Sequence, residues 1–326
     1  MNIYLISDNL TLKSLLFEPV TIKSSWFSLN TIKSPILLVE SAWNGYKDRW
    51  KFKIASYPDH PNRTNEKLVR LVEKAKEKGI PTVFWNKEDS IHFDRFIDSA
   101  KHFDHIFTVD QNCVEKYRAI VPESTTVDVA MFPVQPRIHN YQGFNFQKME
   151  ANFVGSYSKH IHDKRRERQE MLFKAAQKAG LPVTIFDRNS NRSSDNYRYP
   201  KDEFGLSVCP AVSYEQTADI YRQFLVSLNV NTIEDSPTMF SRRVVEILAC
   251  GGILVSTPSQ AVENLFKDYC HIVHSEDEAV AHLERLKYGP SKQDLEMAKA
   301  GADFVLNHFT WRHFLQKIYE TVENRR

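Results

Sequence analysis

Two arginines and a glutamate stand close together in a segment that is otherwise rich in apolar residues. Arg242, Arg243 and Glu246 are spaced so that the glutamate shares a helix face with either arginine. The neighbouring valines, isoleucine and leucine indicate a helix largely enclosed by protein, where an unpaired charge is costly. A pyrophosphate would give one arginine a partner, and a ribose diol would give one to the glutamate. The alternative is an intrahelical ion pair on a solvated surface.

A second candidate site follows an apolar run in the second half of the chain. The stretch N-F-V-G-S-Y ends a predicted strand with Gly155 and Ser156 and leads into a basic helix start that contains Arg165. A glycine turn before a helix N-terminus forms an anion site, because free backbone N–H groups and the helix dipole point at the ligand. Phosphate binding is the functional interpretation, and a solvated basic face is the alternative.

Acidic residues and a histidine follow predicted strands in the first half. A carboxylate or imidazole in such a place could take the proton of an acceptor hydroxyl as a general base. The candidate catalytic residues are Asp8, Glu40, Glu88, Asp89 and His92. For Asp89 the alternative is that it, or Ser90, caps a helix beginning at Ile91.

Short apolar runs alternate with longer helical patterns, which indicates βαβ units and an α/β fold with parallel sheets. Helices are predicted at 65–78, 165–179 and 243–249, and helical periodicity returns at 304–322. Strands are predicted at 3–6, 36–39, 82–85, 105–109, 126–130, 151–154, 183–186, 226–230 and 253–256. Ligands of open α/β sheets bind beyond the carboxyl ends of the strands, which is where the candidate residues stand.

Length and composition narrow the class of protein. A chain of 326 residues is longer than one hydrophobic core usually serves, so two domains are expected. A net charge of +2 gives no sustained attraction to nucleic acid or an anionic membrane. The four cysteines form no CxxC pair, and no apolar run approaches the length of a transmembrane segment. The N-terminus lacks signal-peptide character, so a cytoplasmic protein is expected.

Several motifs, in order, resemble the CgeB-like (spore maturation protein) glycosyltransferase family. They are V-E-S-A-W-N-G at 39–45, P-T-V-F-W-N-K-E-D-S-I-H-F at 81–93, F-D-H-I-F-T-V-D at 103–110, G-S-Y at 155–157, I-F-D-R at 185–188, S-P-T-M-F-S-R-R-V-V-E-I-L-A-C-G at 236–251 and H-F-T-W-R-H at 308–313. The resemblance implies a GT-B architecture, with two Rossmann-like domains whose parallel sheets face across a cleft. It places an acceptor-side domain at 1–145, a nucleotide-sugar-binding domain at 146–303 and a helix crossing back to the first domain at 304–326.

The resemblance also implies roles for single residues. Glu246 looks like the ribose-binding glutamate, and Arg242 or Arg243 like the diphosphate cation. Many related retaining enzymes carry a glutamate eight positions earlier, where this chain has Thr238. The full set of candidate donor-binding residues is Gly155, Ser156, Tyr157, Arg165, Asp187, Arg188, Asn231, Ser236, Thr238, Met239, Phe240, Ser241, Arg242, Arg243 and Glu246.

The expected activity is transfer of a sugar from a nucleotide diphosphate donor, a UDP-sugar, to a hydroxyl of a glycan, cell-envelope polymer, protein or small molecule. The chain has no D-x-D pair to hold a divalent cation, so arginines and a helix dipole are expected to neutralise the leaving group without metal or other cofactor. Two alternatives stay open. One is a nucleotide- or sugar-binding module without turnover that scaffolds a transferase, and the other is a nucleotide-sugar epimerase of GT-B build.

Overall fold

The computed structural model describes residues 2–23 and 35–324, which form two compact units. Unit 1 comprises Met1–Pro133, Pro237–Met239 and Trp311–Arg326, and unit 2 comprises Val134–Ser236 and Phe240–Thr310. Residues 134–145, which the sequence analysis places in the N-terminal domain, cluster with unit 2. The end of the chain from Trp311 onwards clusters with unit 1.

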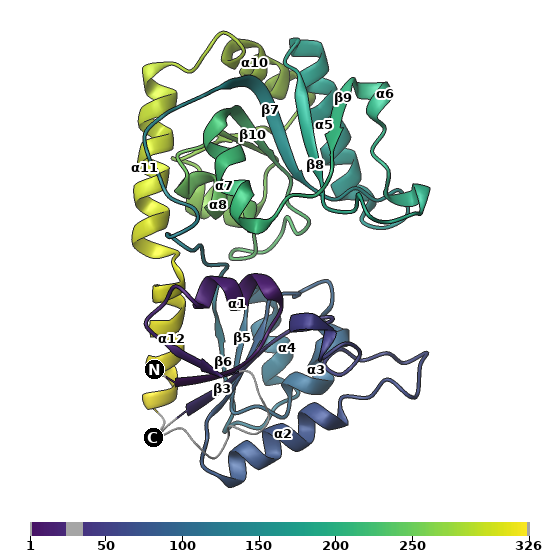
Figure 1. The fold of residues 1–326 in the computed structure, drawn as a ribbon, viewed down its shortest axis with the longest axis vertical. Coiled ribbons are helices and arrows are strands. Elements are labelled where there is room, and N and C mark those ends of the chain that lie inside the picture. The colour runs from purple at the N-terminus through teal and green to yellow at the C-terminus, as the bar shows by residue number, and fades with distance from the viewer. Residues whose placement is uncertain (1, 24–34, 325–326) are drawn as a thin grey trace. The chain divides into compact units, whose positions relative to one another are not determined.

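Unit 1 is built on a parallel sheet with strand order β2-β1-β3-β4-β5-β6 among the described residues (Figure 1). Its central strands are continuous apolar runs because both faces of the sheet are covered. Ile6 pairs with Val39 and Val39 with Phe84, so the carboxyl ends of β1, β3 and β4 emerge side by side. The strands are β1 (Asn2–Ile6), β2 (Thr21–Lys23), β3 (Pro35–Glu40), β4 (Thr82–Asn86), β5 (His105–Thr108) and β6 (Thr126–Val129).

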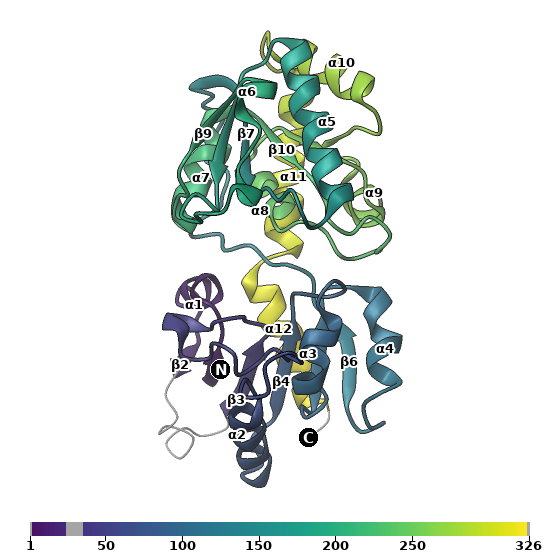
Figure 2. The same cartoon turned by 90° about the vertical axis from the view of Figure 1, so that its right-hand side faces the viewer.

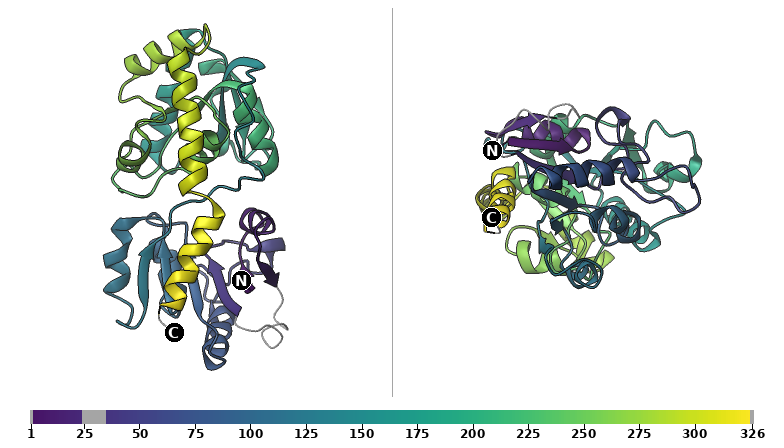
Figure 3. Two further views of the ribbon diagram at one scale, coloured as in Figure 1. Left: turned by 90° about the vertical axis from the view of Figure 1, so that its left-hand side faces the viewer. Right: turned by 90° about the horizontal axis from the view of Figure 1, so that it is seen from below.

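Helices cover both faces of this sheet. On one face, Leu68, Val72 and Phe96 pack with the core side chains of the strands. The last helix of the chain lies on the other face (Figure 3). Its Trp311 and Phe314 contact Trp85. The helices of unit 1 are α1 (Asn9–Leu15), α2 (Glu66–Glu77), α3 (Phe93–Ala100), α4 (Val114–Arg118) and α12 (Trp311–Glu323).

Unit 2 has a parallel sheet with the order β12-β11-β10-β7-β8-β9 (Figure 2). In chain order this is the Rossmann arrangement, whose strand order reverses beside its first strand, here β7. Gly155 at the end of β7 pairs with Asp187 at the end of β8, so their loops leave the sheet together. The strands are β7 (Lys148–Gly155), β8 (Val183–Asp187), β9 (Leu206–Cys209), β10 (Phe224–Asn229), β11 (Leu254–Ser256) and β12 (His271–Ile272).

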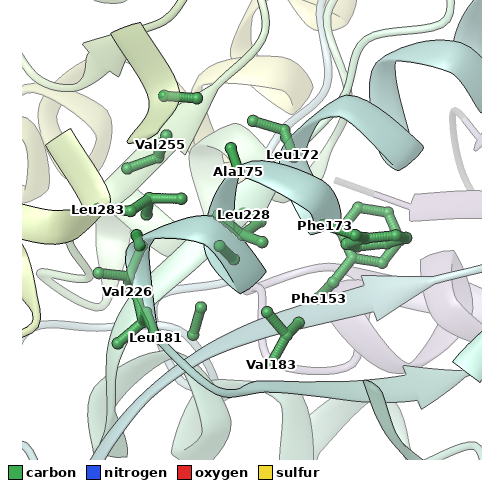
Figure 4. Packing of buried hydrophobic residues seen from close by; sticks show 14 of the residues in the cluster. Phe153, Leu172, Phe173, Ala175, Leu181, Val183, Val226, Leu228, Val255 and Leu283 are labelled. Carbon is green, nitrogen blue, oxygen red and sulfur yellow. The ribbon is translucent and has the colours of Figure 1, made fainter. Parts of the chain in front are cut away.

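The core of unit 2 lies between this sheet and its helices. Phe153 of β7 meets Phe173 edge to face, with ring centroids 5.6 Å apart, and Leu283 joins the same cluster (Figure 4). The helices are α5 (Asp163–Ala179), α6 (Lys201–Phe204), α7 (Tyr214–Gln223), α8 (Arg243–Ala249), α9 (Gln260–Phe266), α10 (Glu276–Leu286) and α11 (Lys292–His308). None of the helices in the described ranges is both long enough and apolar enough to cross a bilayer.

The predicted α/β class with two parallel sheets is confirmed, and one predicted element is wrong. The helical pattern at 304–322 is not one helix, because α11 ends at His308 and α12 starts at Trp311. The carbonyl of Phe309 accepts a hydrogen bond from the Val134 N–H at 2.7 Å, and Thr310 forms a bridge with Val134. This pairing removes Phe309 and Thr310 from the helix.

Candidate functional site

Arg243, the first residue of α8, lies at the centre of the candidate donor site. Its guanidinium donates to the carbonyl of Val154 at 2.9 Å, to the carbonyl of Val230 at 3.1 Å and to Ser241 Oγ at 3.2 Å. The same group lies 4.5 Å from the centroid of the Phe153 ring. Two of its five N–H groups therefore hold the ends of β7 and β10, a third binds Ser241 just before α8, and two remain for a ligand.

The turn after β7 is built around Gly155. A Cβ atom on this glycine would lie 2.7 Å from Arg243 Nη1 and 2.5 Å from the Phe153 ring, so the close approach requires glycine. The Ser156 carbonyl accepts from Arg165 Nη1 at 3.0 Å, and the Gly155 carbonyl accepts from the Arg188 N–H at 2.8 Å. The fold thus brings together the glycine turn and the arginine helix that the sequence analysis singled out separately.

Three arginines lie close enough to repel one another. Burial lowers the pKa of Arg243 to about 10, and the charges of Arg165 and Arg188 act in the same direction. Burial likewise lowers the pKa of Arg165, and Arg188 adds to that effect. Among the described residues, no carboxylate forms an ion pair with any of the three. Convergent cations that form no ion pair with a carboxylate are suited to bind a multiply charged anion.

Glu246 lies one turn further along α8 and is buried. Burial raises the pKa of its carboxyl, while the charges of Arg242, Arg188 and Arg243 oppose that rise. The side chain therefore shares the electrostatic neighbourhood of the arginines, as its spacing predicts. A carboxylate in this place can accept hydrogen bonds from a diol.

The loop before α8 is held by hydrogen bonds of Asn231 and by the packing of Phe240. Asn231 Oδ1 accepts from the Ser241 N–H at 3.0 Å, and Asn231 Nδ2 donates to the Thr257 carbonyl at 3.0 Å. Phe240 is buried against Phe266, with ring centroids 5.0 Å apart. Ser236 is buried as well. Asn231 and Phe240 thus shape the loop, while Ser241 also receives the Arg243 guanidinium.

Two candidate donor residues cluster with unit 1. The segment Pro237–Met239 belongs to that unit, and the Thr238 hydroxyl is engaged there twice. It accepts from the Gln111 N–H at 2.9 Å and donates to the Val109 carbonyl at 3.0 Å. Thr238 therefore anchors its segment at the carboxyl end of β5.

A cavity of about 670 Å³ opens at the carboxyl ends of β8 and β9. Asp187, Tyr199 and Cys209 are among its lining residues. Burial raises the pKa of Asp187, whose Oδ1 accepts from the Asn189 N–H at 2.8 Å. The Tyr157 ring packs at a tilt against the Tyr199 ring, with centroids 5.2 Å apart, and its hydroxyl donates to Glu170. Sequence patterns did not single out Tyr199, because it lies in the predicted polar segment 189–203.

In unit 1, the ends of three adjacent strands gather a charged cluster. Lys87 Nζ contacts Glu40 Oε1 at 3.0 Å and also the Asp8 carboxylate. Thr11 Oγ1 donates to Glu40 Oε2 at 2.5 Å. Burial raises the pKa of Glu40, and the Lys87 charge opposes that rise. The sequence analysis missed Lys87, although its place directly after a strand is the signal that selected Glu88.

Glu88 and His92 lie together with Trp43, apart from the Lys87 contacts. Trp43 Nε1 donates to Glu88 Oε2 at 3.2 Å, and the Trp43 ring meets the His92 ring edge to face at 5.0 Å. Burial lowers the pKa of His92, while the charge of Glu88 opposes that change.

Asp89 does not cap a helix, so that alternative is wrong. The helix α3 begins at Phe93, with His92 at the N-cap position and no side-chain cap. The buried Asp89 carboxylate instead accepts from Asn86 Nδ2 at 2.8 Å, Thr108 Oγ1 at 2.6 Å and Tyr117 Oη at 2.9 Å. Burial raises its pKa to about 7. Asp89 thus joins β4, β5 and α4 from within the unit.

Within residues 2–23 and 35–324, no three His, Cys, Asp or Glu side chains are grouped so as to hold a metal ion. The expectation of metal-independent chemistry stays a prediction.

Comparison with solved structures shows the fold. A glycosyltransferase from Rickettsia africae superposes with a TM-score of 0.60 at 12% identity, over 99% of this chain and 98% of that one. Anabaena HepE, solved with UDP and glucose, gives 0.57 at 10% identity, over 88% and 78%. A variant of TarM from S. aureus, solved with UDP among its ligands, gives 0.53 at 10% identity, over 88% and 55%. This chain thus spans about half the length of TarM. The architecture is that of the GT-B glycosyltransferases.

Sequence comparison points in the same direction. Residues 165–320, slightly less than half of the chain, match the model of a family described as glycosyl transferase-like. The matched range includes Arg165, Arg243 and Glu246, and begins just after the Gly155 turn. No curated protein gives a match. Together, the family match and the GT-B neighbours support a relationship to glycosyltransferases.

Proposed function

We propose that the protein is a glycosyltransferase that moves a sugar from a nucleotide diphosphate sugar, a UDP-sugar, to a hydroxyl acceptor. One observation carries the proposal. Arg165, Arg188 and Arg243 converge without carboxylate partners beside the buried Glu246, at the carboxyl edge of a Rossmann-like sheet. A diphosphate linked to a ribose would provide both ligand groups that this site suits, an anion for the guanidinium groups and a diol for the carboxylate.

The parts of the donor are assigned by chemistry. The remaining two N–H groups of Arg243 bind the diphosphate together with Arg165 and Arg188. Glu246 accepts hydrogen bonds from the ribose hydroxyls. The nucleobase enters the cavity beside Asp187 and Tyr199. Anabaena HepE and the pneumococcal transferase GtfA were both solved with UDP, which supports uridine as the nucleoside.

Asp8 is the general base in this proposal. Glu40 and Asp89, two of the carboxylates at the carboxyl ends of β3 and β4, are buried. Glu88 accepts a hydrogen bond from Trp43 Nε1. The Asp8 side chain is 39% exposed and is held by Lys87. The acceptor oxygen attacks the anomeric carbon while its proton passes to Asp8. The bond from that carbon to the diphosphate oxygen breaks, and the electron pair leaves with the diphosphate. The arginines stabilise this developing charge, so the chemistry needs no divalent cation.

The finer family assignment is also part of the proposal. The motifs quoted above favour a CgeB-like member that transfers a hexose to a glycan, protein or small-molecule hydroxyl. The Thr238 position, where related retaining enzymes carry a glutamate, is occupied by a residue bonded to Val109 and Gln111. The contact to the transferred sugar therefore comes from other residues.

The test is incubation of the purified protein with a panel of nucleotide diphosphate sugars, with release of the nucleoside diphosphate as the readout. Release from a UDP-sugar, accelerated by a hydroxyl acceptor, is expected. Tight UDP binding without any release, even by slow hydrolysis, would instead identify a binding module. An isomerised donor sugar in the absence of acceptor would identify an epimerase.

A further inference from the structure

The Asp8, Glu40 and Lys87 side chains form a compact cluster that the sequence motifs do not explain. They come from the ends of β1 and β3 and from the residue after β4, which are neighbours in the sheet. The Lys87 ammonium contacts one oxygen of each carboxylate. Its side chain is only 6% exposed, and that of Glu40 only 1%. A lysine is thus buried between two carboxylates, and only Asp8 reaches solvent.

Asp8 is fixed from two directions. Its Oδ1 accepts from the Thr11 N–H at 2.9 Å as the N-cap of α1, and its Oδ2 is held by Lys87. The Asp8 N–H donates to Glu40 Oε1 at 2.6 Å. The turn after β3 adds the Tyr46 N–H, which donates to the Ser7 carbonyl at 2.7 Å. The orientation of the Asp8 carboxylate is therefore determined by groups from β3, β4 and α1.

We propose that Lys87 is a positioning residue, which holds the exposed Asp8 carboxylate ionised and oriented toward the acceptor while Glu40 supplies the counter-charge that lets the ammonium stay buried. This inference rests on the proposed function, because it gives Asp8 the role of base. Glu40 from β3 and Lys87 are ionisable groups that contact Asp8 or share Lys87 with it.

A contribution to the stability of the fold is a weak explanation for the cluster of Asp8, Glu40 and Lys87. Burial of a charged pair costs desolvation that an apolar pair of the same volume avoids, so such pairs contribute little net stability. Nevertheless, the cluster carries one positive and two negative groups. Removal of Lys87 would leave Glu40 buried without its cation, and both carboxylates would bind a proton more readily.

The decisive variants are Lys87→Met, Lys87→Arg and Glu40→Gln, with Lys101→Met as control. Lys101 forms an exposed ion pair with Asp98 in the same unit, at 2.5 Å, away from the cluster. We expect Lys87→Met to lower kcat for sugar transfer at least about 30-fold, with KM for the acceptor changed less than about threefold. Lys87→Arg should restore part of kcat, and Lys101→Met should match the parent. UDP affinity should stay unchanged in all four variants.

The pH dependence separates positioning from a loss of packing. Lys87→Met should move the acid limb of the pH–rate profile to higher pH, because a carboxylate without its cation binds a proton more readily. Glu40→Gln should move it to lower pH, because a repelling negative charge is removed. A loss of activity with no displacement of the acid limb in either variant would overturn the proposal, as would full activity in Lys87→Met.

A direct titration decides the inference even if the parent shows no transfer. In protein labelled with carbon-13 at the aspartate carboxyls, with Asp8 assigned through Asp8→Asn, Lys87→Met should raise the titration midpoint of Asp8 by about one pH unit or more. An unmoved midpoint in a variant with native circular dichroism would refute the role of Lys87. Absence of nucleoside diphosphate release from the parent would refute the proposed function alone.

Discussion

At the scale of single residues, Arg243 serves two purposes at once. Three of its N–H groups hold the carbonyls of Val154 and Val230 and the Ser241 hydroxyl, and the rest of the fork is available to an anion. A lysine carries one point charge and cannot reproduce this fork. The identity of the residue matters, therefore, as well as its charge.

We predict that Arg243→Lys weakens UDP binding about 10- to 100-fold and lowers the free energy of unfolding by about 1–3 kcal/mol, because buried carbonyls lose donors. Isothermal titration calorimetry and urea unfolding measure the two effects. Arg222→Lys is the matched control, since Arg222 also donates to backbone carbonyls, those of Ile138 and Asn140. It lies just before β10, at the amino edge of the sheet, so it should cost stability but leave UDP affinity intact. Equal losses of affinity in both variants would contradict the assigned site.

The raised pKa of Asp89 predicts that the free energy of unfolding depends on pH. Burial raises its pKa from 3.8 to about 7, so the folded protein keeps this proton where the unfolded chain has lost it. The contribution of Asp89 to the free energy of unfolding therefore falls as pH rises from about 4 to about 7. Relative to Asp89→Asn, the parent should lose about 2–3 kcal/mol between pH 5 and pH 8. Parallel stability curves for the two proteins across that interval would show that Asp89 ionises normally.

Sequence patterns located part of the candidate site. The spacing of Arg243 and Glu246 and the glycine after a strand were sufficient to select them, because periodicity and turn chemistry are local. The role of Lys87 was not accessible in this way. Its partners, Asp8 and Glu40, are brought to it by the order of the strands, which local patterns do not specify.

At the scale of elements, the turn after β7 shows how two neighbouring side chains restrict the residue type at one backbone position. Gly155 leaves room for the Phe153 ring and the Arg243 guanidinium, and a methyl group there would meet both. The absence of a side chain at Gly155 therefore allows β7, the turn after it and α8 to pack closely.

We predict that Gly155→Ala displaces Arg243 and weakens UDP binding at least about tenfold, with about 1–3 kcal/mol of lost stability from overpacking. Gly289→Ala is a suitable control. Gly289 also belongs to unit 2, has a φ of 109° and has open space around its Cβ position, so alanine there brings backbone strain without a clash. Its UDP affinity should equal that of the parent. Unchanged affinity in Gly155→Ala would mean that the turn and Arg243 act independently.

Three strands that sequence patterns missed contain no continuous apolar run. They are β2 (T-I-K), β9 (L-S-V-C) and β12 (H-I). The division between α11 and α12 depends on Val134, which lies far away in the chain. Long buried strands and amphipathic helices such as α2 were predictable, whereas elements fixed by distant partners were not.

At the scale of the whole molecule, two separate hydrophobic cores underlie the two units. One gathers side chains such as Val39, Phe84 and Phe96, and the other gathers Phe153, Phe173 and others. The candidate anion site belongs to unit 2, whereas the Lys87 cluster belongs to unit 1. A ligand bound through the arginines should therefore stabilise one core selectively.

The distribution of tryptophan makes that selectivity measurable. The chain has five tryptophans, and all of them fall within the segments of unit 1. Tryptophan fluorescence thus follows the unfolding of unit 1, while calorimetry records both units. UDP at 100 times its dissociation constant should stabilise the unit that binds it by about 2.7 kcal/mol. We expect a calorimetric transition to move to higher temperature while the fluorescence transition stays in place. A fluorescence transition that moves as far as the calorimetric one would mean either that unit 1 binds the nucleotide or that the two cores unfold together. Arg243→Lys at the same UDP concentration distinguishes these outcomes, because it should reduce the displacement only if UDP is held by α8.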